Sequence, residues 1–90
     1  MTSRYDESLF TATVTAQEAL AARNNRSYLI IQNNGGDHIR VGFSNALTST
    51  TGVLVAAGLA YAPYPPPSNG VWVIRDSTAG ADVSLSLIDG

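Results

Sequence analysis

His38 is the residue of this sequence best suited to acid–base chemistry near neutral pH, and it lies beside Asp37 at the end of a Gly-rich segment. A general base also needs a nucleophile and a pocket, and a metal ion needs several ligands. One histidine on a turn supplies neither. We therefore expect His38 to be a solvated or locally hydrogen-bonded turn residue.

Three carboxylates raise the possibility of a calcium site. Asp76 and Asp82 flank a second turn, and Asp89 follows near the end of the sequence. Calcium loops concentrate their oxygen ligands more closely than this, so we interpret these residues as turn and strand-edge residues. The sequence also lacks Cys, Lys and any G-x-S-x-G motif. It predicts a protein that is not an enzyme and that has no metal or cofactor.

Composition limits the classes of partner. The 90 residues are 44% apolar and 13% charged, with a formal net charge of −2, and the five cationic residues are scattered arginines. Such a chain has no basic footprint for nucleic acid or anionic lipid. Met1–Ser8 has no secretory apolar run, and Val53–Tyr64 is too short to span a bilayer. We expect neither nucleic acid nor membrane as a partner, and a protein kept in the cytosol unless an assembly carries it out.

The small size of the domain predicts self-association. A chain of this length buries a smaller fraction of its surface than a larger domain does, and its stability is marginal without an added device. Disulfides are excluded because the sequence has no Cys. A homo-oligomer is the remaining ordinary solution.

A period of two dominates the hydrophobic pattern, as is typical of β-strands. We predict an all-β protein, a compact antiparallel β-sandwich or small barrel of seven or eight short strands, spanning residues 9–90 behind a flexible arm, residues 1–8. Ser27–Gln32 is apolar on both faces and predicts a central strand covered on both sides. The predicted strands are Leu9–Thr15, Ser27–Gln32, Ile39–Phe43, Val53–Val55, Leu59–Tyr61, Val71–Ile74 and Val83–Leu87.

The connections are predicted from their turn residues. Asn and Gly at 33–36 tolerate positive φ, so Tyr28–Phe43 is predicted to be a hairpin, and Val71–Leu87 repeats its pattern. The polar, Thr-rich stretch Ser44–Gly52 predicts a loop with no core-facing pattern, and four prolines at 63–67 exclude a central strand there. Residues Ala16–Arg23 fit either a capping-box helix or an extended edge strand.

Aromatic residues and prolines near the middle of the sequence are the best candidates for a contact surface. Tyr61, Tyr64 and Trp72 bracket the proline run, and a stiff segment with aromatics suits a protein interface or a sugar-stacking platform. For Trp72 the favoured alternative is that it plugs the end of the sandwich, because Trp is usually substantially buried. Two arginines that suit carboxylate contacts complete the set. The candidate interface residues are Arg23, Arg26, Tyr61, Tyr64, Pro65, Pro66 and Trp72.

One stretch carries a resemblance to a known family. Residues 21–33 read AARNNRSYLIIQN, which resembles a signature of small β-rich virion proteins of tailed bacteriophages. Matching elements follow in order: Ile39–Phe43, then Leu54, Gly58 and Tyr61, then Gly70–Ile74, then Ala79 and Gly80. The similarity covers about Phe10 to Ile88 and favours an extended chain over a helix at 17–21.

The resemblance implies a capsid decoration, or cement, protein on the surface of a virion, with the major capsid protein as its partner. A trimer is the oligomer favoured for such a protein, and a dimer is the alternative. A tail, fibre or head-appendage module and a carbohydrate-binding β-sandwich are the alternatives. If Arg26 faces a partner, Arg26→Ala should leave the fold intact and weaken assembly, whereas Ile30→Asp should abolish folding by burying an unpaired charge.

Overall fold

The computed structural model describes residues 6–90 as an all-β sandwich. It confirms the predicted fold class, and the described residues contain no helix and hence no membrane-spanning helix. The strands are β1 (Asp6–Ala12), β2 (Gln17–Leu20), β3 (Leu29–Asn33), β4 (Ile39–Gly42), β5 (Val53–Val55), β6 (Ala60–Tyr61), β7 (Val71–Arg75) and β8 (Val83–Asp89).

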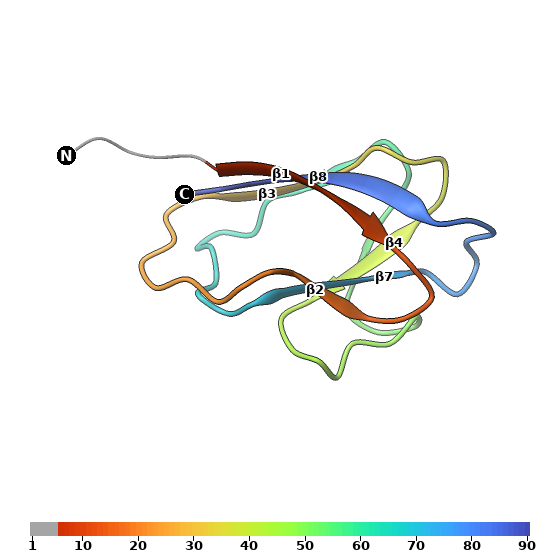
Figure 1. Ribbon diagram of the computed structural model, residues 1–90, viewed down its shortest axis with the longest axis horizontal. Helices are drawn as coiled ribbons and strands as arrows, with labels where there is room; N and C mark the ends of the chain where they lie inside the picture. The colour runs from red at the N-terminus through yellow and green to blue at the C-terminus, as the bar shows by residue number, and fades with distance from the viewer. Residues whose placement is uncertain (1–5) are drawn as a thin grey trace.

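The strands form two four-stranded antiparallel sheets. The first sheet has the order β1-β8-β3-β6, and the second has the order β2-β7-β4-β5. Figure 1 shows them as two layers, with β1, β3 and β8 in one and β2 and β7 in the other. The described end of the chain at β1 lies in the same sheet as the C-terminal strand.

Each sheet turns one face of its strands toward the other sheet, as period-two alternation requires. The buried residues are aliphatic, and each fully buried Val, Leu or Ile side chain contributes about 1.5–3 kcal/mol through its apolar surface. Phe10, Leu20, Phe43 and Tyr61 pack around them. The core consists of Ala12, Leu29, Ile31, Ile39, Val41, Val55, Val71, Val73, Val83, Leu85 and Leu87.

The two predicted hairpins are wrong. β3 and β4 belong to different sheets, and so do β7 and β8, so each pair forms an arch between the layers. In an arch the two successive strands belong to different sheets and their apolar faces pack on each other. In a hairpin the two strands would pair within the same sheet. The arches lie side by side, because the N–H of Asn34 donates to the carbonyl of Ser84 and that of Asp76 to the carbonyl of His38.

Other boundaries also differ from prediction. Residues 6–8 of the predicted arm belong to β1, where they pair with β8, and residues 1–5 lie outside the described part. The segment at 17–20 is strand β2, which resolves the choice between helix and strand. The loop at 44–52 contains buried Leu47, which packs over Gly42 on the outer face of the second sheet and not in the core between the sheets. Ile30 is half-buried, because within residues 6–90 the two sheets are the only layers and neither covers the outer face of β3.

Candidate interaction surface

The outer face of the first sheet is almost uncharged. Among the outward-facing side chains of β1, β8, β3 and β6, Glu7 is the one with a formal charge. Leu9 on β1 is 77% exposed, and Ile30 and Ile88 are half-buried in the neighbouring strands. The register places Ile88 directly between Glu7 and Ile30, which gives one row across three strands. This face is the candidate interaction surface.

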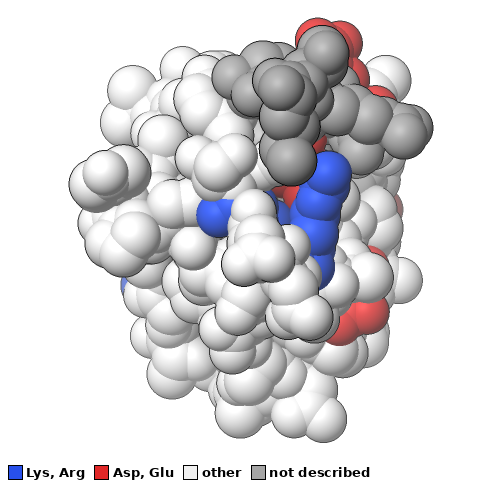
Figure 2. Space-filling view, turned by 90° about the vertical axis from the view of Figure 1, so that its left-hand side faces the viewer, with Lys and Arg blue, Asp and Glu red and all other residues white. Residues whose placement is uncertain are grey.

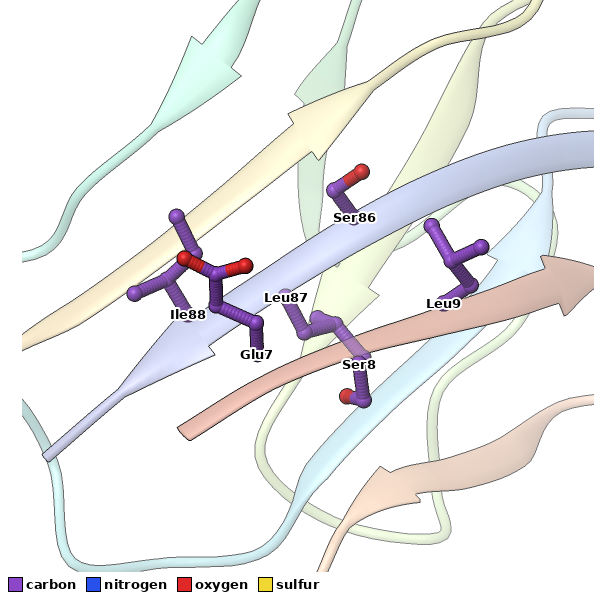
Figure 3. A pocket seen from close by; sticks show the side chains of 6 residues that line it. All are labelled: Glu7, Ser8, Leu9, Ser86, Leu87 and Ile88. Carbon is purple, nitrogen blue, oxygen red and sulfur yellow. The ribbon is translucent and has the colours of Figure 1, made fainter. Parts of the chain in front are cut away.

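An open groove of about 590 Å³ runs along β1 and β8 in this part of the first sheet. Figure 3 shows that the lining residues come from the two adjacent strands, with Glu7 beside Ile88. The lining is apolar and hydroxyl-bearing, with Glu7 as its charged member: Glu7, Ser8, Leu9, Ser86, Leu87 and Ile88. The ionisable and hydroxyl groups of this lining are one carboxylate and two serines.

Aromatic residues continue the outer face at the end of the first sheet. Tyr28 precedes β3 and is 40% exposed, and Tyr64 in the proline segment is 93% exposed. Together with Pro63 and Pro66 they line a small hollow of about 100 Å³. An exposed tyrosine held beside prolines offers contact area at a low cost in conformational entropy.

The other predicted contact aromatics lie elsewhere. Tyr61 is on β6, opposite Ile31, and packs against the core. Trp72 is in the second sheet between Glu18 and Gly42, half-buried on the outward side, so it does not plug the core. The hollow beside Tyr64 is lined by Tyr28 and prolines and does not include Trp72.

Arg26 is an internal residue and not a surface contact, which corrects the prediction made for it. Its side chain has no exposed area, and its Nε donates to Oδ2 of Asp89 at 3.2 Å. Its Nη1 donates to the carbonyls of Pro67 and Asn69 at 2.6 and 2.9 Å, and its Nη2 to the carbonyl of Ala21 at 3.0 Å. These bonds join the end of β8 to the chain beside β2 and β7, so Arg26 ties one sheet to the other.

Arg23 contacts the same carboxylate from the surface. Its Nη1 lies 3.3 Å from Oδ2 of Asp89, and its side chain is 36% exposed. Figure 2 views the end of the sandwich that contains the C-terminus, where cationic atoms lie beside acidic ones and most of the remaining visible surface is uncharged. Asp89 is thus neutralised within the chain, which removes it from any calcium site.

Asp76 is held in a second network at the opposite end of β7. Its carboxylate accepts hydrogen bonds from the Thr78 hydroxyl at 2.5 Å, from Nε of Arg40 at 2.6 Å and from the Thr78 N–H at 3.0 Å. These donors, the Thr78 hydroxyl first, hold the pKa of Asp76 well below its ordinary value. Asp82 pairs with Arg75 instead. No group of three His, Asp or Glu side chains within residues 6–90 is placed to hold a metal ion.

His38 is a locally bonded residue of the first arch, as the sequence predicted. Its Nδ1 accepts a hydrogen bond from the N–H of Ala57 at 3.2 Å. Asn33, at the start of the same arch, is fully buried, and its Nδ2 donates to the carbonyls of Asp37 and Val55. Its Oδ1 accepts from the N–H of Gly35. The amide of Asn33 therefore fixes the arch that the sequence suggested as a hairpin.

The segment at 21–33, on which the resemblance rests, contains two buried polar residues. Arg26 and Asn33 are hydrogen-bonded within the chain. These bonds serve the fold. Comparison of the chain with protein-family models, with curated proteins and with solved structures finds no match.

Proposed function

We propose that this protein is a non-enzymatic virion protein that decorates a bacteriophage capsid, binding the major capsid protein through the outer face of the first sheet. The observation that carries the proposal is the outer face of the first sheet, where Glu7 is the one formal charge among the outward-facing strand residues and Leu9 is 77% exposed, with Tyr64 exposed in the proline segment. Exposed apolar faces of this kind are typical of protein interaction sites. The resemblance at 21–33 directs the choice of partner.

The rest of the molecule suits a passive binding role. Every Arg and most of the Asp residues described above serve contacts within the chain, and the groove on β1 and β8 has no nucleophile with a base. A rigid body with one adhesive face can bridge neighbouring capsid subunits. Modest contacts to several subunits then add through effective concentration, whether the protein is presented as a trimer or as a dimer.

Co-sedimentation with expanded, undecorated capsids tests the proposal. We expect saturable binding at micromolar protein concentration, and absence of binding there would contradict it. A parallel sample of purified tails separates a capsid role from a tail or fibre role, because a tail protein would sediment with the tails alone.

A matched pair of variants locates the binding face. Tyr64→Asp adds a charge beside Tyr28 at the first sheet, and Leu54→Asp adds the same charge to an exposed residue of β5 in the second sheet. We expect Tyr64→Asp to weaken capsid binding about tenfold or more, which corresponds to roughly 1.4 kcal/mol, and Leu54→Asp to leave it unchanged. The opposite order would move the contact to the second sheet.

A further inference from the structure

The four edge strands of the sandwich differ in how well they resist pairing with another chain. β2 is short and its register shifts between Glu18 and Leu20. β5 has three residues, and β6 has two and leads into the proline segment. Short, irregular or proline-flanked edges are the usual protection against edge-to-edge association. Three of the four edges are protected in this way.

β1 has none of these protections. It is seven residues long, contains no Pro, Lys or Arg, and pairs with β8 in an unbroken register from Asp6 to Ala12. In an antiparallel strand, alternate residues direct their N–H and C=O groups to opposite sides. Within residues 6–90, β1 pairs with β8 alone, so the groups on its other side form an open edge.

We propose that β1 pairs antiparallel with β1 of a second copy of this chain, about a two-fold axis through Leu9, so that the two first sheets become one continuous sheet. In this register Leu9 faces Leu9 of the second copy, and Glu7 faces Thr11 of the second copy. Ser8 and Phe10 face each other on the inner side. All seven residues of β1 take part.

The chemistry of β1 selects this register. Side chains that face each other across an antiparallel pair lie on the same side of the sheet, so the axis must pass through a residue. An axis through Glu7 would oppose two carboxylates, and an axis through Ser8 would oppose Glu7 to Leu9. An axis through Phe10 would pair only five residues and leave Leu9 opposite Thr11. The axis through Leu9 opposes no like charges.

The same register covers the most exposed apolar residue of the strand. Leu9 is 77% exposed, and its cross-strand neighbour Ser86 covers little of it. Two Leu9 side chains on adjacent strands would contact each other and shield the apolar wall of the groove in Figure 3. Because the strand is complementary to itself, a second copy is the occupant it fits. The proposal does not depend on capsid binding and makes a dimer, not a trimer, the unit in solution.

Sedimentation velocity of the full chain over a micromolar concentration range tests the association. We expect a monomer–dimer equilibrium that Leu9→Lys weakens about tenfold or more, because two ammonium groups would face each other. Val14→Lys is the matched control: Val14 is 71% exposed in the turn after β1 and lies outside the proposed contact. A monomer at all concentrations, a trimer, or equal effects of the two variants would overturn the proposal.

Cysteine cross-linking tests the register, since the sequence has no Cys of its own. Facing Cα atoms in an antiparallel pair lie about 4.5–5.5 Å apart, within the range that a disulfide spans. Leu9→Cys should therefore form a disulfide-linked dimer under mild oxidation. Thr11→Cys alone should not, but should cross-link when mixed with Glu7→Cys. Efficient Thr11→Cys homodimers, or no Leu9→Cys dimer, would contradict the register even if Leu9→Lys failed to fold.

Discussion

The two sheets differ in what covers their outward-facing side chains. On the second sheet, Leu47 from the loop at 44–52 lies against Gly42 and is 8% exposed, and the outward residue Ile74 is 5% exposed. Among residues 6–90 no loop packs over the first sheet in this way, and Leu9 is 77% exposed, compared with 46% for Leu54 on the second sheet. Covering one face more than the other is a difference that core packing alone does not require. The bare face is therefore available for a partner.

The cover on the second sheet depends on close backbone approach. The loop returns at Gly52, which has a φ of 80°, and a Cβ atom there would lie 2.5 Å from the carbonyl oxygen of Val41. Glycine is the residue that adopts this conformation without steric cost. Leu47 fills the space above Gly42 that a larger side chain would occupy. These two glycines allow the loop to lie flat on the sheet.

The comparison predicts that substitutions at Arg26 or Leu47 lower the stability of the fold. Substitutions on the outer face of the first sheet are predicted to weaken binding instead. Arg26→Ala should have the largest effect on stability, because it leaves Asp89 buried without its main partner and removes donors from the chain beside β2 and β7. We expect a loss of about 3–5 kcal/mol, measured by urea denaturation.

Arg23→Ala is the control for this prediction, because Arg23 contacts the same carboxylate from a partly exposed position. Its removal should cost about 1 kcal/mol or less. Equal losses for the two variants would show that Asp89, and not the tie made by Arg26 to the second sheet, determines the effect.

Leu47→Ala should have the next largest effect. It removes a buried side chain from the cover of the second sheet, and such changes cost about 2–4 kcal/mol when the site cannot collapse. Thermal or urea unfolding measures the loss, and folded Leu47→Ala should retain capsid binding. A loss below about 0.5 kcal/mol, the usual range for surface changes, would mean that the loop does not stabilise the sheet.

The sequence was sufficient to predict the class of fold and most strands. Apolar residues that alternate with polar ones, such as Leu85 and Leu87 or Ile39 and Val41, indicate directly that one face of a strand is buried. The two residues of each pair lie in the same strand, so the pattern is local. The same alternation does not say which sheet a strand joins. The arch after Asn33 was therefore interpreted as a hairpin, since its turn residues suit both connections.

The interaction surface was less accessible to prediction. Arg26 bonds to Asp89, a residue 63 positions away, so no local pattern indicates that it is internal. Leu47 is a single apolar residue in a polar loop, although glycines at 42 and 52 were a usable signal. Tyr64 is exposed, and its role in a contact stays a prediction, whereas the alternation around Leu9 indicates a strand but not that Leu9 is left exposed.

Acid should weaken the ion pair between Asp76 and Arg40 on the second sheet. The pKa of Asp76 lies below its ordinary value of 3.8 in the folded protein, so the unfolded chain binds the proton more readily. The stabilisation is complete above that ordinary value and is lost as the pH falls through the lower pKa of the folded state. Urea midpoints should therefore drop from about pH 5 to about pH 3, and drop less in Asp76→Asn. An equal drop in both proteins would assign the acid sensitivity to other carboxylates.

Leu9→Ala should have the smallest effect on stability and so separates the two faces most directly. Leu9 is 77% exposed, and its truncation removes few contacts within the chain, so we expect a change of about 0.5 kcal/mol or less in the free energy of unfolding. The same substitution made at Leu47 should be several times more costly. If Leu9→Ala unfolds the protein as readily as Leu47→Ala does, the outer face of the first sheet stabilises the fold, and its exposure cannot be assigned to a partner.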